Sequence, residues 1–240
     1  MDGGSQDVGG DLMDDIGLTG IFKAIGDEIG MERTTAAFAP FTELKVRWRR
    51  SDSFIDFAIS DYFSEAPEGI VEMLAETLFE RIYQGMGDYP EEFCEWVTSD
   101  GFIGMNRGKY LERCGALEGY VEEHHSLRKA YEDLVDIGYI DEIPGLVLRW
   151  TASPVAQPKG VSSVLMRSVI MPTYMDTDAI SEDAFEFNLY RLLLNVVAKF
   201  GEDPAVNKMR IDRKIAEYPD CGRLTIEIEN SIPIAVYGGF

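Results

Sequence analysis

The stretch SEDAFEFNLYRLLLNVVAKFG, residues 181–201, decides the expected fold because it is the most apolar helix-like segment of the chain. Ser181 is a favourable N-cap residue, acidic residues follow it in the first turn, and Gly201 stands just after the end. A helix that is apolar around most of its circumference must be buried in a core. We therefore expect this segment to be the central helix, against which other elements pack.

In the segments on either side of the central helix, the spacing of apolar residues differs from segment to segment. GLVLRWTA (residues 145–152) and GVSSVLMRSVIMP (residues 160–172) have strand character, and proline and glycine residues occupy the loop between them. After the central helix, residues 202–219 are expected to form a more exposed helix. The apolar residues in 224–238 alternate with polar ones at first, which predicts one or two terminal strands.

The N-terminal part of the chain contains a predicted β-hairpin. FTELKVRWRR (residues 41–50) and FIDFAISDYF (residues 54–63) both alternate apolar and polar side chains, and Ser-Asp-Ser between them is a turn signal. Helical spacing of apolar residues predicts four helices before residue 140: residues 19–29 with Thr19 as the candidate cap, 66–84, 90–103 and 122–137.

Composition predicts one soluble, acidic domain. Apolar residues make up 45% of the 240 residues and aromatic residues 11%, which is enough for a substantial core. Residues 1–17 are rich in Gly and Asp and are expected to be a disordered acidic tail. We expect residues 18–240 to form a single α+β domain, with a small mixed or antiparallel sheet packed against helices.

The formal net charge of -21 limits the partners that the protein can bind. Such a charge repels a phosphate backbone and an anionic membrane surface at long range, so it argues against nucleic acid and membrane as partners. The chain has no apolar run of about 18 residues that would cross a bilayer, and its acidic N-terminus lacks the pattern of a signal peptide. We therefore expect a cytoplasmic protein. The sequence does not identify its partner, and a protein is one option.

Motifs for common chemistries are missing from the sequence. The three cysteines, Cys94, Cys114 and Cys221, form no Cys-x-x-Cys pair and are expected to be ordinary thiols. The glycine signatures of dinucleotide, nucleotide and α/β-hydrolase sites do not occur. No cofactor is therefore expected.

Several sequence segments, in their order along the chain, resemble those of the SprT-like zinc metallopeptidases, especially the compact prokaryotic members. The resemblance spans residues 43–200 and implies a zincin-like core with a helical insertion. The segments that show this resemblance are residues 45–82 (opening hairpin and first helix), 110–114 and 121–140 (the stretch before the sheet), 146–154 (a strand with tryptophan) and 160–172 (the next strand).

In such enzymes the helix after these strands carries His-Glu-x-x-His, whose two histidines bind zinc while the glutamate acts as general base. The resemblance places Arg191 and Asn195 at the histidine positions and Leu192 at the glutamate position. Arginine is a permanent cation that cannot ligate zinc, and leucine cannot accept a proton. No histidine occurs after His125. The resemblance therefore implies a vacated zinc site with no catalytic residue and no metal.

Arg191 is then a cation one turn inside an apolar helix, which is costly unless it is paired. We expect it to form an ion pair that replaces the metal, or alternatively to hold an anionic ligand in the vacated cleft. The candidate acids for the ion pair are Asp176, Asp178 and Glu186.

Two other groups of residues are candidate sites. Glu122 and His125 have the i, i+3 spacing of a metal-binding pair on one helix face, although di-iron sites need more such ligands. Basic side chains gather on the predicted hairpin, where they are either a solvated strand face paired with Asp56 or neighbouring acids, or an anion-binding patch. These basic residues are Lys45, Arg47, Arg49 and Arg50.

Three functions remain open from the sequence. The first is a non-catalytic SprT-like homologue that acts as a binding or assembly module. The second is a hydrolase with a relocated metal site that uses Glu122, His125 and acids from elsewhere in the chain. The third is association with nucleic acid through the basic residues of the hairpin, against which the net charge argues.

Overall fold

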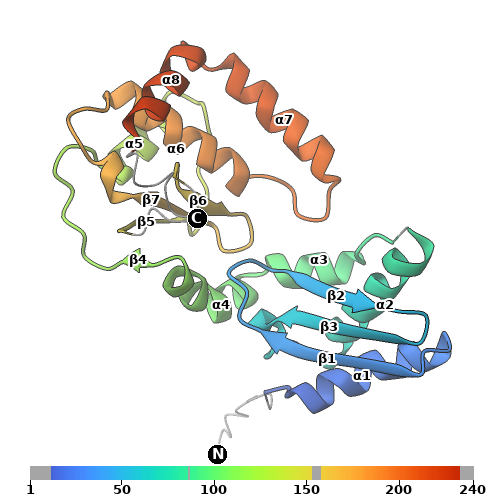
Figure 1. Cartoon of the computed structure of the whole chain (residues 1–240). Helices are drawn as coiled ribbons and strands as arrows, with labels where there is room; N and C mark the ends of the chain where they lie inside the picture. The colour runs from blue at the N-terminus through green and yellow to red at the C-terminus, as the bar shows by residue number, and fades with distance from the viewer. Residues whose placement is uncertain (1–11, 86, 153–157, 233–240) are drawn as a thin grey trace, which may run out of the picture. The chain divides into compact units, whose positions relative to one another are not determined.

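The computed structural model describes residues 12–85, 87–152 and 158–232 of the chain. In these ranges the protein is α+β, with eight α-helices and two small mixed sheets. The chain divides into two compact units, residues 1–97 and 98–240, which we describe one at a time (Figure 1). The α+β class is thus confirmed, while the single domain expected over residues 18–240 stays a prediction.

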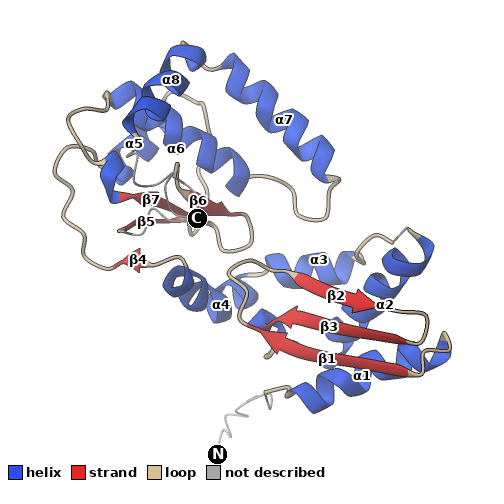
Figure 2. Ribbon diagram, viewed as in Figure 1, coloured by secondary structure: helices blue, strands red, loops and turns tan. Residues whose placement is uncertain are grey.

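The first unit is built on a three-stranded sheet, drawn in red in Figure 2. Its central strand β3 (Phe54–Ser60) is parallel to β1 (Arg33–Ala39) and antiparallel to β2 (Val46–Arg50). The predicted hairpin is therefore confirmed as β2–β3. The helical elements of this unit are α1 (Asp15–Glu28), the 3-10 turn η1 (Asp61–Phe63), α2 (Glu68–Gln84) and α3 (Glu91–Thr98).

Helices α1 and α2 cover the same face of this sheet. The rings of Phe22 on α1 and Phe79 on α2 lie 4.8 Å and 5.3 Å from the ring of Phe57 on β3. Close approach of α1 to β1 requires glycine at position 26, because a Cβ there would stand 2.0 Å from the hydroxyl of Thr34. The opposite face of the sheet carries polar side chains beside the half-buried ring of Phe54.

The second unit contains a four-stranded sheet in the order β4-β5-β7-β6. The central strands β5 (Val147–Thr151) and β7 (Ser168–Pro172) are parallel, and the outer strands β4 (Ala116–Leu117) and β6 (Val161–Ser163) are antiparallel to their neighbours. The helical elements are α4 (Asp100–Arg113), α5 (Leu127–Asp136), the 3-10 turn η2 (Thr173–Met175), α6 (Glu182–Val196), α7 (Pro204–Glu217) and α8 (Cys221–Ser231).

The central helix of this unit is α6, as the sequence predicted. Ser181 caps it by accepting a hydrogen bond from the Ala184 N–H at 3.3 Å. Ten of its fifteen residues are buried, and it packs against β6 and β7 while α5 and α8 pack against it (Figure 1). Burial on several sides explains why its sequence is apolar around most of the circumference.

Two helices begin at other residues than predicted. Helix α1 begins at Asp15 because the Asp14 carboxylate caps the Gly17 N–H at 2.8 Å, so Thr19 lies inside the helix and not at its cap. Helix α5 begins only at Leu127, with Ser126 as its cap. Residues 122–125, which were expected to be helical, lie before it.

The strand predictions needed three corrections. Residues 160–172 form two strands, because a turn that contains Arg167 at a φ of 43° reverses the chain. The segment that contains Leu224 and Ile228 is helix α8, since these two residues one turn apart are buried while Ile226 between them is 60% exposed. Strand β1 was missed because its buried side chains are small. The last predicted strand residues, 233–238, lie outside the described residues.

None of the helices in the described ranges is long and apolar enough to cross a membrane.

Candidate functional site

Leu192, at the position where the resemblance expects a general base, is buried in apolar contacts on α6. It is 8% exposed, and a Cβ at Gly160 would stand 2.9 Å from its Cδ1 atom and 2.8 Å from the carbonyl oxygen of Ile170. The leucine therefore packs directly on the backbone at Gly160, whose φ of 101° suits glycine. This position offers no group that could take a proton from water.

The two flanking positions on α6 differ from each other in exposure. Asn195 is exposed, and its side-chain amide donates a hydrogen bond to the Arg191 carbonyl oxygen at 3.0 Å. Arg191 is half-buried, and its guanidinium carbon lies 5.8 Å from the centroid of the Phe187 ring. Neither side chain presents a zinc ligand of the usual kind.

The ion pair expected for Arg191 is wrong in the part of the chain that the structure describes. Its Nη1 atom is buried and has no hydrogen-bond partner there, and no acid of these ranges lies within ion-pair distance. Burial lowers the pKa of Arg191, and the charge of Glu229 opposes this shift. Glu229 is itself paired with Lys159 at 2.9 Å.

Asp176, one of the acids expected to pair with Arg191, instead accepts hydrogen bonds from a different segment. The backbone N–H groups of Glu123, His124 and His125 donate to its carboxylate at 2.7–2.8 Å, and the hydroxyl of Tyr120 donates at 3.2 Å. Burial by itself would raise the pKa of Asp176, but the backbone hydrogen bonds outweigh burial and the net pKa is lowered. The carboxylate thus fastens residues 120–125 to η2.

Glu122 and His125 do not share a helix face, because both precede α5. The Glu122 carboxylate accepts hydrogen bonds from the Leu127 N–H at 2.9 Å and from the Trp150 indole at 3.0 Å. His125 Nε2 lies 3.0 Å from the carbonyl oxygens of Thr177 and Ile180. Because carbonyl oxygens only accept, this ring nitrogen carries a hydrogen in this arrangement and is not free to bind a metal.

Three carboxylates that the sequence did not single out lie close together. Ligand oxygens of Asp133 on α5 and of Glu182 and Glu186 on α6 lie within 4.8 Å of one another. Burial raises the pKa of Glu186, and the charges of Asp133 and Glu182 add to this shift. Carboxylates suit hard cations, but the ammonium group of Lys129 already pairs with Glu182 and lies 3.7 Å from Asp133.

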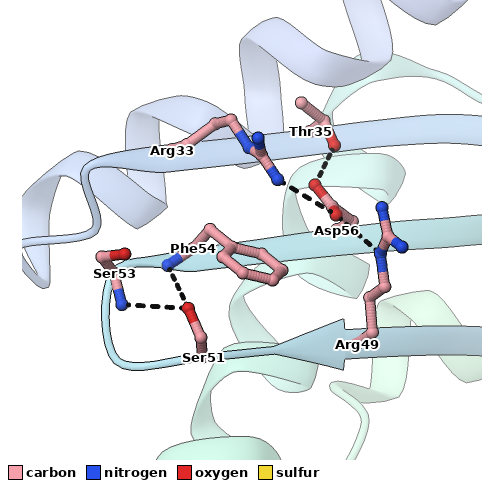
Figure 3. A network of polar contacts seen from close by, with 7 residues as sticks. All are labelled: Arg33, Thr35, Arg49, Ser51, Ser53, Phe54 and Asp56. Carbon is pink, nitrogen blue, oxygen red and sulfur yellow. Dashed lines mark hydrogen bonds and ion pairs between the residues drawn. The ribbon is translucent and has the colours of Figure 1, made fainter.

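The basic residues of the hairpin are divided between the two faces of the first unit's sheet. Figure 3 shows Asp56 on the open face, where it accepts from Thr35 at 2.6 Å and pairs with Arg49 at 2.9 Å and Arg33 at 3.4 Å. The hydrogen bond from Thr35 is the main cause of the lowered pKa of Asp56. Of the four basic residues named from the sequence, Arg49 therefore pairs with Asp56 as expected.

The other basic residues are spread along and beyond strand β2. Arg50 points toward α2, where it donates to the Ile82 carbonyl oxygen at 3.1 Å and lies over the Tyr83 ring. Arg47 lies over the ring of Phe41, and Lys45 is exposed before the strand begins. These cations do not converge on a single point.

A cavity of about 780 Å³ lies in the second unit between α5, β5 and the chain that follows β4. Aromatic side chains form part of its wall: the rings of Tyr120 and Trp150 lie 5.3 Å apart, and the Tyr131 hydroxyl accepts a hydrogen bond from the Ile143 N–H at 2.7 Å. Its volume is within the range of ligand sites.

One edge of β5 is open beside this cavity. Strand β4 pairs only with Trp150 and Thr151, and the chain then turns at Gly119, where φ is 69°. In the described ranges, Val147–Arg149 therefore has no strand neighbour on this edge. We refer to this cavity and the open edge of β5 together as the β5 groove.

No family model matches the chain, and neither a curated protein nor a solved structure matches it. The class that fold and site define is thus an α+β protein with two small mixed sheets and a groove beside β5.

Proposed function

We propose that this protein is a non-catalytic relative of the SprT-like zinc metallopeptidases that acts as a binding or assembly module. In this proposal the stretch that resembles the family, residues 43–200, spans parts of both units, and α6 corresponds to the helix that carries the zinc motif in active enzymes. The observation that carries the proposal is the burial of Leu192 against Gly160. An apolar side chain packed on the backbone supports a structural role for the position that would otherwise activate water.

The binding role is supported by the β5 groove. It combines a cavity of ligand-site volume, aromatic walls and an open strand edge in one unit of the protein. An alternative hydrolase with a relocated site would need Glu122 and His125 as ligands, but both side chains make structural hydrogen bonds.

The metal content of the protein distinguishes these functions. We expect protein purified without chelator to contain less than about 0.1 zinc per chain, and EDTA to leave its thermal unfolding unchanged. The matched control is the double variant Arg191→His with Asn195→His, which places two imidazoles one helical turn apart and should gain zinc affinity. Stoichiometric zinc in the unmodified protein, with loss of fold or of peptidase activity after chelation, would overturn the proposal.

A further inference from the structure

We propose that the β5 groove binds an extended peptide segment that carries lysine or arginine side chains and adds to β5 as an antiparallel strand. This inference rests on the proposed binding function and names the class of partner. Three features of the second unit support it, namely the open backbone edge, the shape of the groove and the charge of its walls.

The backbone of Leu148 faces the groove. The Val147 N–H donates to the Arg167 carbonyl oxygen at 2.9 Å, on the side of β7. Since successive residues of a strand point their backbone groups to opposite edges, the N–H and C=O of Leu148 point to the other edge. The Leu148 carbonyl oxygen there accepts only from the guanidinium of Arg149 at 3.0 Å within the described ranges. An incoming strand can replace this local contact.

The groove has the shape that an added strand requires. Strand β4 is antiparallel to β5, the chain turns at Gly119, and residues 117–120 line the same cavity as Leu148. A peptide in this cavity would continue the antiparallel pairing that β4 begins. Main-chain hydrogen bonds then supply affinity, and the walls on either side select the side chains.

The charge of the walls favours a basic peptide. Five carboxylates line the groove against two guanidinium groups, and one pair of these, Arg128 with Glu132, is joined at 3.2 Å. None of the four remaining acids forms an ion pair within the described ranges. Glu122 accepts hydrogen bonds from Leu127 and Trp150, which leaves Glu118, Asp136 and Glu142 for a cationic partner. The net charge of -21 attracts a basic segment at long range and repels an acidic one.

Fluorescence anisotropy with three labelled peptides tests the proposal. The first alternates valine and lysine, the second alternates valine and glutamate, and the third repeats the first with N-methyl groups on alternate amides. We expect the lysine peptide to bind the full chain at least about tenfold more tightly than either other peptide. Equal binding of the methylated and unmethylated lysine peptides would overturn strand addition, and no binding of either would overturn the site.

Charge-reversed variants locate the binding. Glu118→Lys with Glu142→Lys should weaken binding of the lysine peptide at least about tenfold. The matched control, Asp52→Lys with Glu72→Lys, changes the net charge equally but alters exposed acids of the other unit, and should weaken binding much less. Equal losses in both variants would mean that net charge alone holds the peptide, which contradicts a groove.

The same samples separate this inference from the proposed function. Mass spectrometry after incubation should find every peptide intact. Cleaved peptide would overturn the non-catalytic function whether or not binding follows the expected order. Intact but unbound peptides would overturn only the inference about the groove. Concentration-dependent dimerisation that the groove variants abolish would identify a second copy of the chain as the occupant, and would also overturn a basic peptide partner.

Discussion

The backbone N–H of His125 lies 2.7 Å from the carboxylate of Asp176, 51 residues further along the chain. This hydrogen bond is one of three that the same carboxylate accepts from consecutive N–H groups. It joins the segment before α5 to the segment before α6, and Glu122 in the first segment then contacts Trp150 on β5. One buried acid thus holds a wall of the β5 groove in place.

Replacing Asp176 by asparagine should destabilise the protein by about 2–3 kcal/mol, because an amide oxygen is a weaker and less complete acceptor than a carboxylate. The folded-state pKa of Asp176 is lowered. Its contribution to stability is therefore present above the unfolded-state pKa of about 4 and is lost as pH falls through the folded-state value. Urea unfolding at pH 7 and at acidic pH measures both effects.

The control for this prediction is Asp178→Asn, which changes an exposed acid two residues away. Its unfolding free energy should change by less than about 0.5 kcal/mol at pH 7. If the unfolding free energy falls equally in the two variants, the hydrogen bonds between Asp176 and the segment before α5 do not stabilise the protein as predicted.

Replacing Arg191 by methionine should leave stability unchanged or raise it by about 1 kcal/mol. The guanidinium is half-buried with one nitrogen unsatisfied by the described residues, and an apolar side chain of similar length avoids that desolvation cost. Thermal and urea unfolding provide the measurement. Arg210→Met is the comparison, because Arg210 is paired with Glu202 at 2.8 Å and its loss should destabilise. Destabilisation of the Arg191 variant by 2 kcal/mol or more would contradict this account.

Replacing Gly160 by alanine should cost about 1–3 kcal/mol, because φ is 101° and the new Cβ would collide with the Ile170 carbonyl oxygen and with Leu192. Gly222→Ala is the matched control, since Gly222 lies in α8 with nothing near its Cβ position, and alanine should stabilise the helix by about 0.5–1 kcal/mol. Opposite signs in chemical unfolding are expected. A harmless Gly160 variant would mean that Leu192 is not packed as tightly as the geometry requires.

Binding of the protein to single-stranded or double-stranded DNA should be undetectable even at low salt. The net charge of -21 repels phosphate, and Asp56 neutralises part of the charge of Arg33 and Arg49 on the open face of the first sheet. Electrophoretic mobility shift at about 20 mM salt measures this. The Asp56→Ala variant is the more sensitive test for DNA binding, because it leaves the guanidinium groups of Arg33 and Arg49 without this acid. Salt-dependent binding by the unmodified protein would contradict the prediction.

Features that depend on neighbouring residues were predictable from the sequence. The central helix α6, its cap Ser181, the hairpin β2–β3 and helix α7 follow from local periodicity and capping chemistry. Residue identity likewise determined that positions 191, 192 and 195 carry no zinc ligand of the usual kind. These conclusions do not depend on the tertiary contacts of the residues.

The pattern of apolar residues gave a wrong secondary structure where tertiary packing determines whether a segment is a helix or a strand. Leu224, Ile226 and Ile228 fit a strand as well as a helix, and the burial of the first and last against the core selected the helix. Strand β1 has little apolar signal of its own, because Gly26 brings α1 so close that only small side chains fit beneath it. Neither outcome is visible within a short window of sequence.

The sequence by itself determined the acidic charge, the main helices and the absence of zinc-motif residues on α6, because each depends on residue type or on spacing within a few turns. Only the tertiary structure decided that Asp176 holds residues 123–125 and that, among the described residues, Arg191 lacks the expected partner and one edge of β5 is open. These features join segments that are dozens of residues apart. The pairing and packing of whole elements set such distances, and local periodicity carries no information about them.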